Sequence, residues 1–84
     1  MNKIEELFGT INIDRYLCTN DGIVGLEIAI YFEGIDDFEI FTIFKTGQGN
    51  CTLNPTTYEK IKENYLTLDE FMKDLYEYAT LNLL

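Results

Sequence analysis

The feature that most constrains the fold is an alternating run of apolar side chains at residues 23–33. Every second position in this run carries a large apolar residue, and these positions are Val24, Leu26, Ile28, Ile30 and Phe32. Because successive side chains of a β-strand point to opposite faces, the period of two predicts a strand with one buried face. Looser alternation at residues 10–19 and 37–45 predicts an antiparallel neighbour on each side.

Turn signals set the register that we expect between these strands. Asp21-Gly22 is a strong two-residue hairpin signal, and residues 34–36 can form the second loop. A slip of one residue would move every side chain to the opposite face, so the apolar pattern selects the pairing. The expected pairs are Leu17–Leu26, Ile13–Ile30, Ile11–Phe32, Phe32–Phe38, Ile30–Ile40 and Leu26–Phe44.

The opposite face of the expected sheet combines acids with a small aromatic and aliphatic group. Its expected members are Asn12, Asp14, Tyr16, Glu27, Ala29, Tyr31, Glu33, Asp37, Glu39, Phe41, Ile43 and Lys45. An exposed apolar patch with a polar rim is typical of binding surfaces, which favours Tyr31 and Phe41 as partner-binding residues. In the alternative interpretation, the N-terminal helix covers Phe41 and Ile43.

Helix signals precede and follow the strands. Asn2 and Glu5 can form a capping box for a short N-terminal helix that ends at Gly9. After the sheet, Asn54 can cap a second helix with Pro55 at its first position. The expected inner stripe of this second helix is Tyr58, Ile61 and Tyr65.

The last helix has the clearest pattern. Thr67 and Glu70 form a second capping box, and the helix is expected to run to about Asn82. The side chains at helical spacing that should face the sheet are Leu68, Phe71, Met72, Leu75, Tyr78 and Ala79. The predicted fold is therefore one α+β domain over residues 1–84: a short N-terminal helix, a three-stranded antiparallel sheet and two C-terminal helices.

Residue types for catalysis are scarce. The chain has no histidine, which removes the common hydrolase triads and most zinc sites. The carboxylates fall on hairpin ends and helix exteriors, where nothing excludes water, and they lack the spacing of a calcium loop. Residues 46–50 are glycine-rich, but no lysine follows as in a P-loop. We expect no enzymatic activity, no cofactor and no metal.

Length and cysteine usage indicate where the protein works. A chain of 84 residues has one modest core and no room for a large enclosed pocket. Cys18 and Cys51 are far apart and have no histidine partner, so two buried or half-buried free thiols in a reducing cytoplasm are expected. The start of the chain is acidic where a signal peptide is apolar, and no apolar run reaches the length of a membrane span. These features predict a cytoplasmic protein, in the host cell if a phage encodes it.

Charge narrows the class of partner. The chain carries 15 acidic and 6 basic residues, a formal charge of −9. Such a surface repels nucleic acids and anionic lipid and attracts basic proteins. The acids that we expect to bind a partner form two clusters, Glu33, Asp36, Asp37 and Glu39 at a hairpin end and Asp69, Glu70, Asp74 and Glu77 along the last helix. Carboxylates fixed on a rigid body can imitate phosphates in a basic groove.

The element order, length and acidity, together with the segment Asp69-Glu70-Phe71-Met72-Lys73-Asp74-Leu75, resemble the compact type II-A anti-CRISPR proteins of phages. In that family, acids occupy the site where an RNA-guided DNA nuclease reads its short DNA signal. The resemblance implies this role for Asp69, Glu70 and Asp74 first, and for Asp36 and Asp37 second. Gly34-Ile35 is less polar than the central loop of that family.

Two further hypotheses remain open. The same charge would suit an antitoxin or immunity-type protein that neutralises a basic toxin. Alternatively, the chain is a small structural subunit that assembles through Tyr31, Phe41 and Ile43, with its charge serving solubility. We accordingly expect a monomer or a small homo-oligomer with no direct contact to nucleic acid or membrane.

Overall fold

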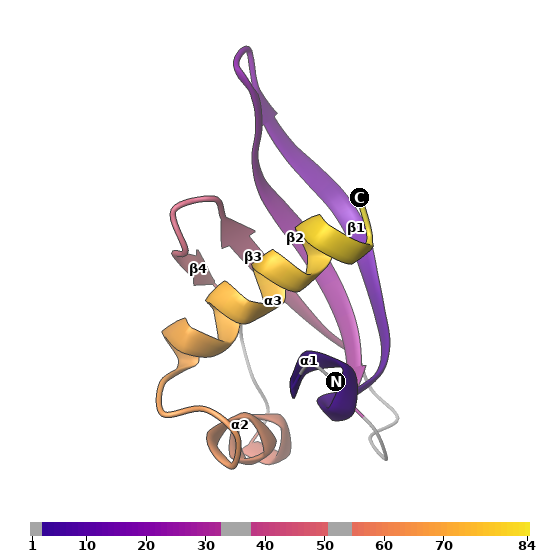
Figure 1. Cartoon of the computed structure of the whole chain (residues 1–84), viewed down its shortest axis with the longest axis vertical. Coiled ribbons are helices and arrows are strands. Elements are labelled where there is room, and N and C mark those ends of the chain that lie inside the picture. The colour runs from indigo at the N-terminus through magenta and orange to yellow at the C-terminus, as the bar shows by residue number, and fades with distance from the viewer. Residues whose placement is uncertain (1–2, 33–37, 51–54) are drawn as a thin grey trace.

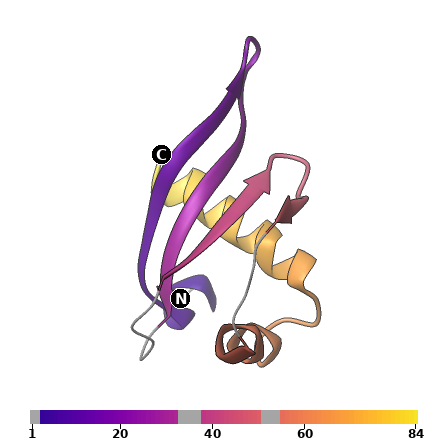
Figure 2. The same cartoon turned by 180° about the vertical axis from the view of Figure 1, so that it is seen from behind.

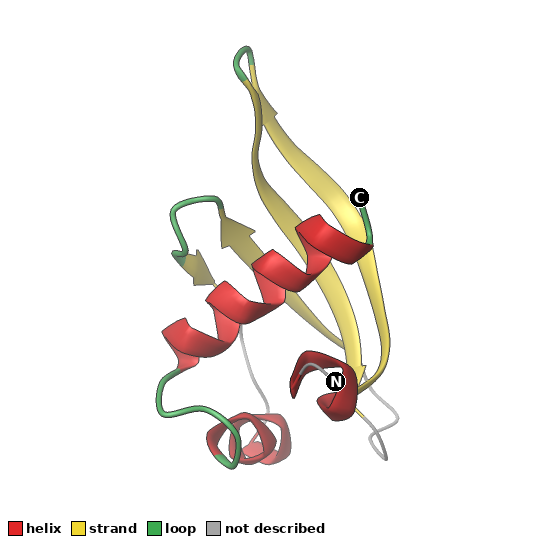
Figure 3. Ribbon diagram, viewed as in Figure 1, coloured by secondary structure: helices red, strands yellow, loops and turns green. Residues whose placement is uncertain are grey.

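The computed structural model describes residues 3–32, 38–50 and 55–84, and these form an α+β protein in which helices cover one face of an antiparallel sheet (Figures 1 and 3). The sheet is a meander in the order β1-β2-β3-β4. In chain order the elements are α1 (Lys3–Leu7), β1 (Phe8–Thr19), β2 (Gly22–Phe32), β3 (Phe38–Phe44), β4 (Gly49–Asn50), α2 (Pro55–Lys62) and α3 (Leu68–Asn82). The α+β class, the three main strands and the two C-terminal helices confirm the sequence prediction.

The β1–β2 hairpin turns one residue earlier than we expected. Thr19 pairs with Gly22, so the turn residues are Asn20 and Asp21. Gly22 has φ of 121°, a conformation that residues with a Cβ rarely adopt. The register moves by two positions near Ile11, which keeps that side chain on the same face as expected because the side-chain period is also two. Three irregularities interrupt the β1–β2 pairing, two with an extra residue on β1 and one with an extra residue on β2. Leu17 pairs with Gly25 instead of Leu26, so the prediction for this side chain is wrong and it lies on the opposite face.

The β2–β3 register differs from our prediction by a single residue, and the consequence is large. Ile28 pairs with Phe41 and Ile30 with Glu39, where the prediction had Ile30 opposite Ile40. Every side chain of β3 therefore lies on the face opposite to the expected one. The apolar pattern alone does not select the β2–β3 register, because β3 is apolar on both faces and the length of the loop at residues 34–36 is only inferred. That loop lies outside the described residues.

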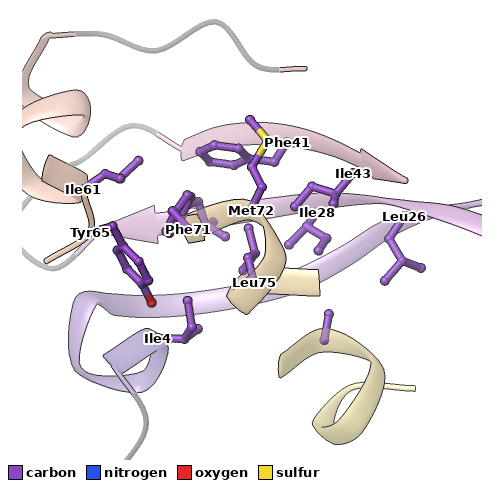
Figure 4. Close-up of a cluster of buried hydrophobic side chains, with 12 residues drawn as sticks. Ile4, Leu26, Ile28, Phe41, Ile43, Ile61, Tyr65, Phe71, Met72 and Leu75 are labelled. Atoms are coloured by element: carbon purple, nitrogen blue, oxygen red, sulfur yellow. The ribbon is translucent and has the colours of Figure 1, made fainter. Parts of the chain in front are cut away.

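Helix α3 crosses the sheet and builds the core as its pattern predicts (Figure 4). The hydroxyl oxygen of Thr67 accepts a 3.2 Å hydrogen bond from the backbone N–H of Glu70, which is the predicted cap. The rings of Phe41 and Phe71 pack edge to face at 5.3 Å, and those of Tyr65 and Phe71 at 5.4 Å. Such pairs add to the stabilisation from burial alone. The buried side chains of α3 are Phe71, Met72, Leu75 and Ala79.

Helix α2 turns a different side inward than we expected. Thr57 and Ile61, one helical turn apart, are buried, whereas Tyr58 is 44% exposed. The prediction for Tyr58 is therefore wrong, although Ile61 and Tyr65 do join the core. A helix advances about 100° per residue, so burying Thr57 carries Tyr58 toward solvent. The predicted cap Asn54 lies outside the described residues. No helix within the described ranges is long and apolar enough to cross a membrane.

Candidate functional site

The acids of α3 lie on the side of the helix that faces away from the sheet. Asp69, Glu70 and Glu77 are exposed, and Asp74 is half-buried. The core side chains on the other side of α3 hold the helix at a fixed position over the sheet (Figure 4). Asp69 and Glu70 also occupy the first turn, where negative charge stabilises a helix by interacting with its dipole. The structure therefore brings together all four acids that the sequence placed in this cluster.

Lys73 lies within this acidic group, one helical turn from both Asp69 and Glu77. Its aliphatic chain rests against the β3–β4 turn, because a Cβ added to Gly47 would lie 3.1 Å from the Lys73 Cε atom. Gly47 has φ of 92°, which also favours glycine there. Lys73 thus connects α3 to this turn, and one positive charge offsets part of the negative charge on the helix.

Asp74 is positioned by its contact with a buried tyrosine. Tyr65 follows α2 and is 6% exposed. Burial raises the pKa of Tyr65, and the neighbouring Asp74 carboxylate raises that pKa further. A surface hollow of about 200 Å³ is lined by Tyr65, Glu70, Lys73 and Asp74. A second hollow of about 320 Å³ is lined by Asp69 at the start of α3 and by Phe44, Gln48 and Gly49, which lie at the end of β3, in the β3–β4 turn and at the start of β4. Carboxylates of α3 thus line both hollows.

Of the second predicted cluster, only Glu39 lies within the described residues, and it is not exposed. Glu39 faces the core with 9% exposure, and its carboxylate accepts a 3.1 Å hydrogen bond from the hydroxyl of Thr57. The prediction that Glu39 lies on an exposed acidic face is wrong, because the β2–β3 register differs by one residue from the predicted register. The other members, Glu33, Asp36 and Asp37, lie outside the described residues.

Tyr31 and Phe41 lie on opposite faces of the sheet, so they do not form the shared patch that we expected. Tyr31 is 37% exposed and packs at 5.7 Å against the ring of Phe38. Phe41 and Ile43 are fully buried, with Phe71 of α3 against Phe41. The prediction of an exposed Phe41 is therefore wrong, and the alternative of a covered Phe41 is right. The helix whose aromatic ring covers it is α3 rather than the N-terminal helix.

Exposed apolar residues that we did not predict lie on the side of the sheet away from α3. We call this side the outer sheet face, and its paired side chains include Arg15, Leu17, Glu27, Ala29, Tyr31, Phe38, Ile40, Thr42 and Phe44. Phe38, Ile40 and Phe44 are between 38% and 51% exposed. The signal for them was present in the sequence, because β3 alternates two apolar sets. Only the register decides which set is exposed.

The described residues contain no group of three or more Cys, Asp or Glu side chains that could hold a metal ion. Cys18 in β1 is a free thiol, but it is exposed, so the prediction of a buried or half-buried side chain is wrong for it. Cys51 lies outside the described residues. Comparison with models of known protein families, with curated proteins and with solved structures gives no match. Charge and geometry are therefore the basis for a functional proposal.

Proposed function

We propose that this chain is a non-enzymatic acidic binding protein that occupies a basic nucleic-acid-binding site on another protein. The observation that carries this proposal is the division of α3 into an inner side packed against the core and an outer side with three exposed acids, Asp69, Glu70 and Glu77, and the half-buried Asp74. Because the backbone of a packed helix is already ordered, binding through its acids costs less entropy than binding through a flexible segment. Fixed carboxylates are therefore better ligands for a basic groove than the same acids on a flexible tail.

The spacing of these acids supports imitation of a phosphate backbone. Glu70, Asp74 and Glu77 follow each other at roughly 6 Å and 4.5 Å along the helix axis. One strand of DNA carries a phosphate about every 3.4 Å along its axis, so the two charge spacings are of the same order. Arginine side chains that bind phosphate or guanine also bind carboxylates in a bidentate manner.

The partner that we propose is an RNA-guided DNA nuclease, in line with the resemblance to type II-A anti-CRISPR proteins. Nucleases of this class hold nucleic acid in a positively charged channel and read a short DNA signal with arginine. The α3 acids, with Asp69 at the N-terminal end, would compete for that arginine site. The fold contributes the rigid support, and the overall charge of −9 accelerates the encounter.

A competition experiment tests this function. A guide-loaded type II-A nuclease is mixed with a labelled target duplex, and the chain is titrated against the complex at several salt concentrations. We expect the chain to displace the duplex, with an affinity that falls as salt rises, because the contacts are ionic. A nuclease that keeps its duplex at every concentration of the chain would contradict the nuclease proposal. Neutralisation of a basic toxin by the chain would favour the antitoxin hypothesis instead.

A further inference from the structure

The outer sheet face lacks a covering layer. In Figure 2 the strands lie in front of α3, and no described helix lies over them. Phe38 is 51% exposed, Ile40 39% and Phe44 38%, and all three come from the same strand. Phe38 and Ile40 are neighbours on this face, and Thr42 separates them from Phe44. Exposed apolar side chains with polar residues around them are typical of interaction sites.

Charge distinguishes this face from the rest of the molecule. Arg15 and Glu27 are the charged residues at the paired positions of its described strands, and they stand directly opposite each other. Their charges cancel, although the chain as a whole carries −9. A basic partner would gain little from this face. Two copies of the chain, by contrast, can approach each other here without bringing their α3 acids together, because α3 lies on the other side of the sheet (Figure 2).

Side chains on this face differ in size between β2 and β3. Large side chains on β3 form a ridge, and Ala29 on β2 leaves a low point beside it. Ala29 and Ile40 are direct cross-strand neighbours, so they lie at the same level along the strands. A two-fold axis parallel to the strands and between β2 and β3 would place β3 of each copy over β2 of the other. Ile40 of each copy would then lie over Ala29 of the second copy.

We propose that two copies of this chain associate face to face through their outer sheet faces, with Ile40 of each copy packed over Ala29 of the other. Aligned sheets pack about 10 Å apart and cross at about 30°, so contacts are closest near the middle of the strands, where this pair lies. Helix α3 is on the opposite side of the sheet (Figures 1 and 2). The dimer therefore leaves both acidic helices free, and it is independent of the proposed inhibitor function.

The area of the face sets the strength that we expect. Three strands about 4.8 Å apart and 7 paired residues with a rise of about 3.3 Å give a flat face of roughly 300 Å² per copy. Standard stable interfaces bury about 800 Å² per partner. The dimer is consequently weak and dependent on concentration. Because both copies are negative, salt should strengthen it, whereas salt weakens the docking of α3 on a basic partner.

Sedimentation velocity of the chain from about 10 µM to about 1 mM, the range of weak interfaces, tests the proposal. We expect the mass to rise from the 9.8 kDa of one chain toward twice that value, and to rise further with added salt. Ile40→Glu should hold the chain at monomer mass throughout this range. Leu81→Glu is the matched control, because Leu81 is 74% exposed on α3 and far from the outer face, and it should dimerise like the wild type.

A second variant distinguishes specific packing in the dimer from non-specific association. Ala29→Leu adds apolar surface to the outer face, so non-specific association would become stronger. In the proposed dimer the larger side chain fills the low point that receives Ile40, and association becomes weaker. Wild-type chain that stays monomeric at the highest concentration, or an Ala29→Leu variant that associates more strongly, would overturn the proposal. Circular dichroism of each variant confirms that its fold is intact.

Discussion

The hydroxyl of Thr57 on α2 donates a 3.1 Å hydrogen bond to the carboxylate of Glu39 on β3, and both side chains are buried. This bond links the second helix to the sheet at a position where sequence alone suggested an exposed acid. It also explains why the buried side of α2 includes a threonine. Buried polar groups of this kind are tolerated where they have hydrogen-bond partners.

Thr57→Val removes this donor while keeping the shape of the side chain. We expect a loss of about 1–3 kcal/mol in the free energy of unfolding, the range for removing one partner of a buried hydrogen bond. Urea denaturation measures the effect. Thr56→Val is the matched control, because Thr56 is exposed on the same helix, and it should change stability by less than about 0.5 kcal/mol. Equal effects of the two variants would contradict the buried contact.

The register of β3 can be tested with two substitutions of the same type. Phe41→Ala should lower the free energy of unfolding by about 3–5 kcal/mol, because it leaves a cavity beside Phe71. Phe38→Ala, on the other face of the same strand, should cost less than about 1 kcal/mol because Phe38 is 51% exposed. The register first inferred from the sequence gives the reverse order, so equilibrium denaturation of both variants discriminates between the two.

The close approach of the β3–β4 turn to α3 predicts that Gly49 does not tolerate a side chain. A Cβ at this position would lie 2.7 Å from the sulfur of Met72 and 2.7 Å from the backbone oxygen of Thr42. The sulfur can move, but the backbone oxygen belongs to a strand. Gly49→Ala should therefore destabilise the fold by about 1–3 kcal/mol. Gln48→Ala, at the exposed neighbouring position, is the control and should have little effect on the thermal midpoint.

The pKa of Tyr65 predicts a dependence of stability on alkaline pH. Burial and the neighbouring Asp74 raise this pKa above 10.0, so the folded state keeps its proton where the unfolded state begins to lose it. The folded state then binds more protons, and stability falls as pH rises above about 10. Tyr65→Phe removes this contribution. We expect the difference in unfolding free energy between wild type and Tyr65→Phe to shift in favour of the variant above that pH, whereas parallel pH profiles would contradict the account.

Local patterns in the sequence predicted the fold better than patterns that depend on distant segments. The boundaries of α3 followed from Thr67 and Glu70 and from its apolar stripe, all within one helix. The register of β3 depends on the length of the loop before it, which the sequence does not fix, and both faces of that strand are apolar. An error of one residue in the predicted register placed Glu39 and Phe41 on the surface, whereas both lie in the core.

The same difference between local and long-range patterns applies to the candidate site. The exposure of Asp69, Glu70 and Glu77 follows from the sequence, because a helix of known phase fixes which residues face solvent, whereas Asp74 is half-buried beside Tyr65. The outer sheet face was missed, because its identity depends on tertiary packing of α3 against one of two similar faces. Packing of Phe71 against Phe41 determines which face of β3 is buried, and this contact joins residues far apart in the sequence.

The central claim is that acids at fixed positions on α3 bind a basic nucleic-acid site, and paired charge reversals test it most directly. One variant combines Asp69→Lys, Glu70→Lys and Glu77→Lys. The control combines Asp14→Lys, Glu59→Lys and Glu63→Lys, which are exposed on β1, on α2 and directly after α2. Both variants have the same net charge, and neither changes Asp74, which packs beside Tyr65.

The measurement is the dissociation constant of each variant for a guide-loaded type II-A nuclease at fixed, moderate salt. With about 1 kcal/mol for each lost contact, the α3 variant should bind roughly 100-fold more weakly than the wild type. The control should lose much less, since it changes only the long-range attraction. Equal losses in the two variants, or an unchanged affinity of the α3 variant, would contradict the claim.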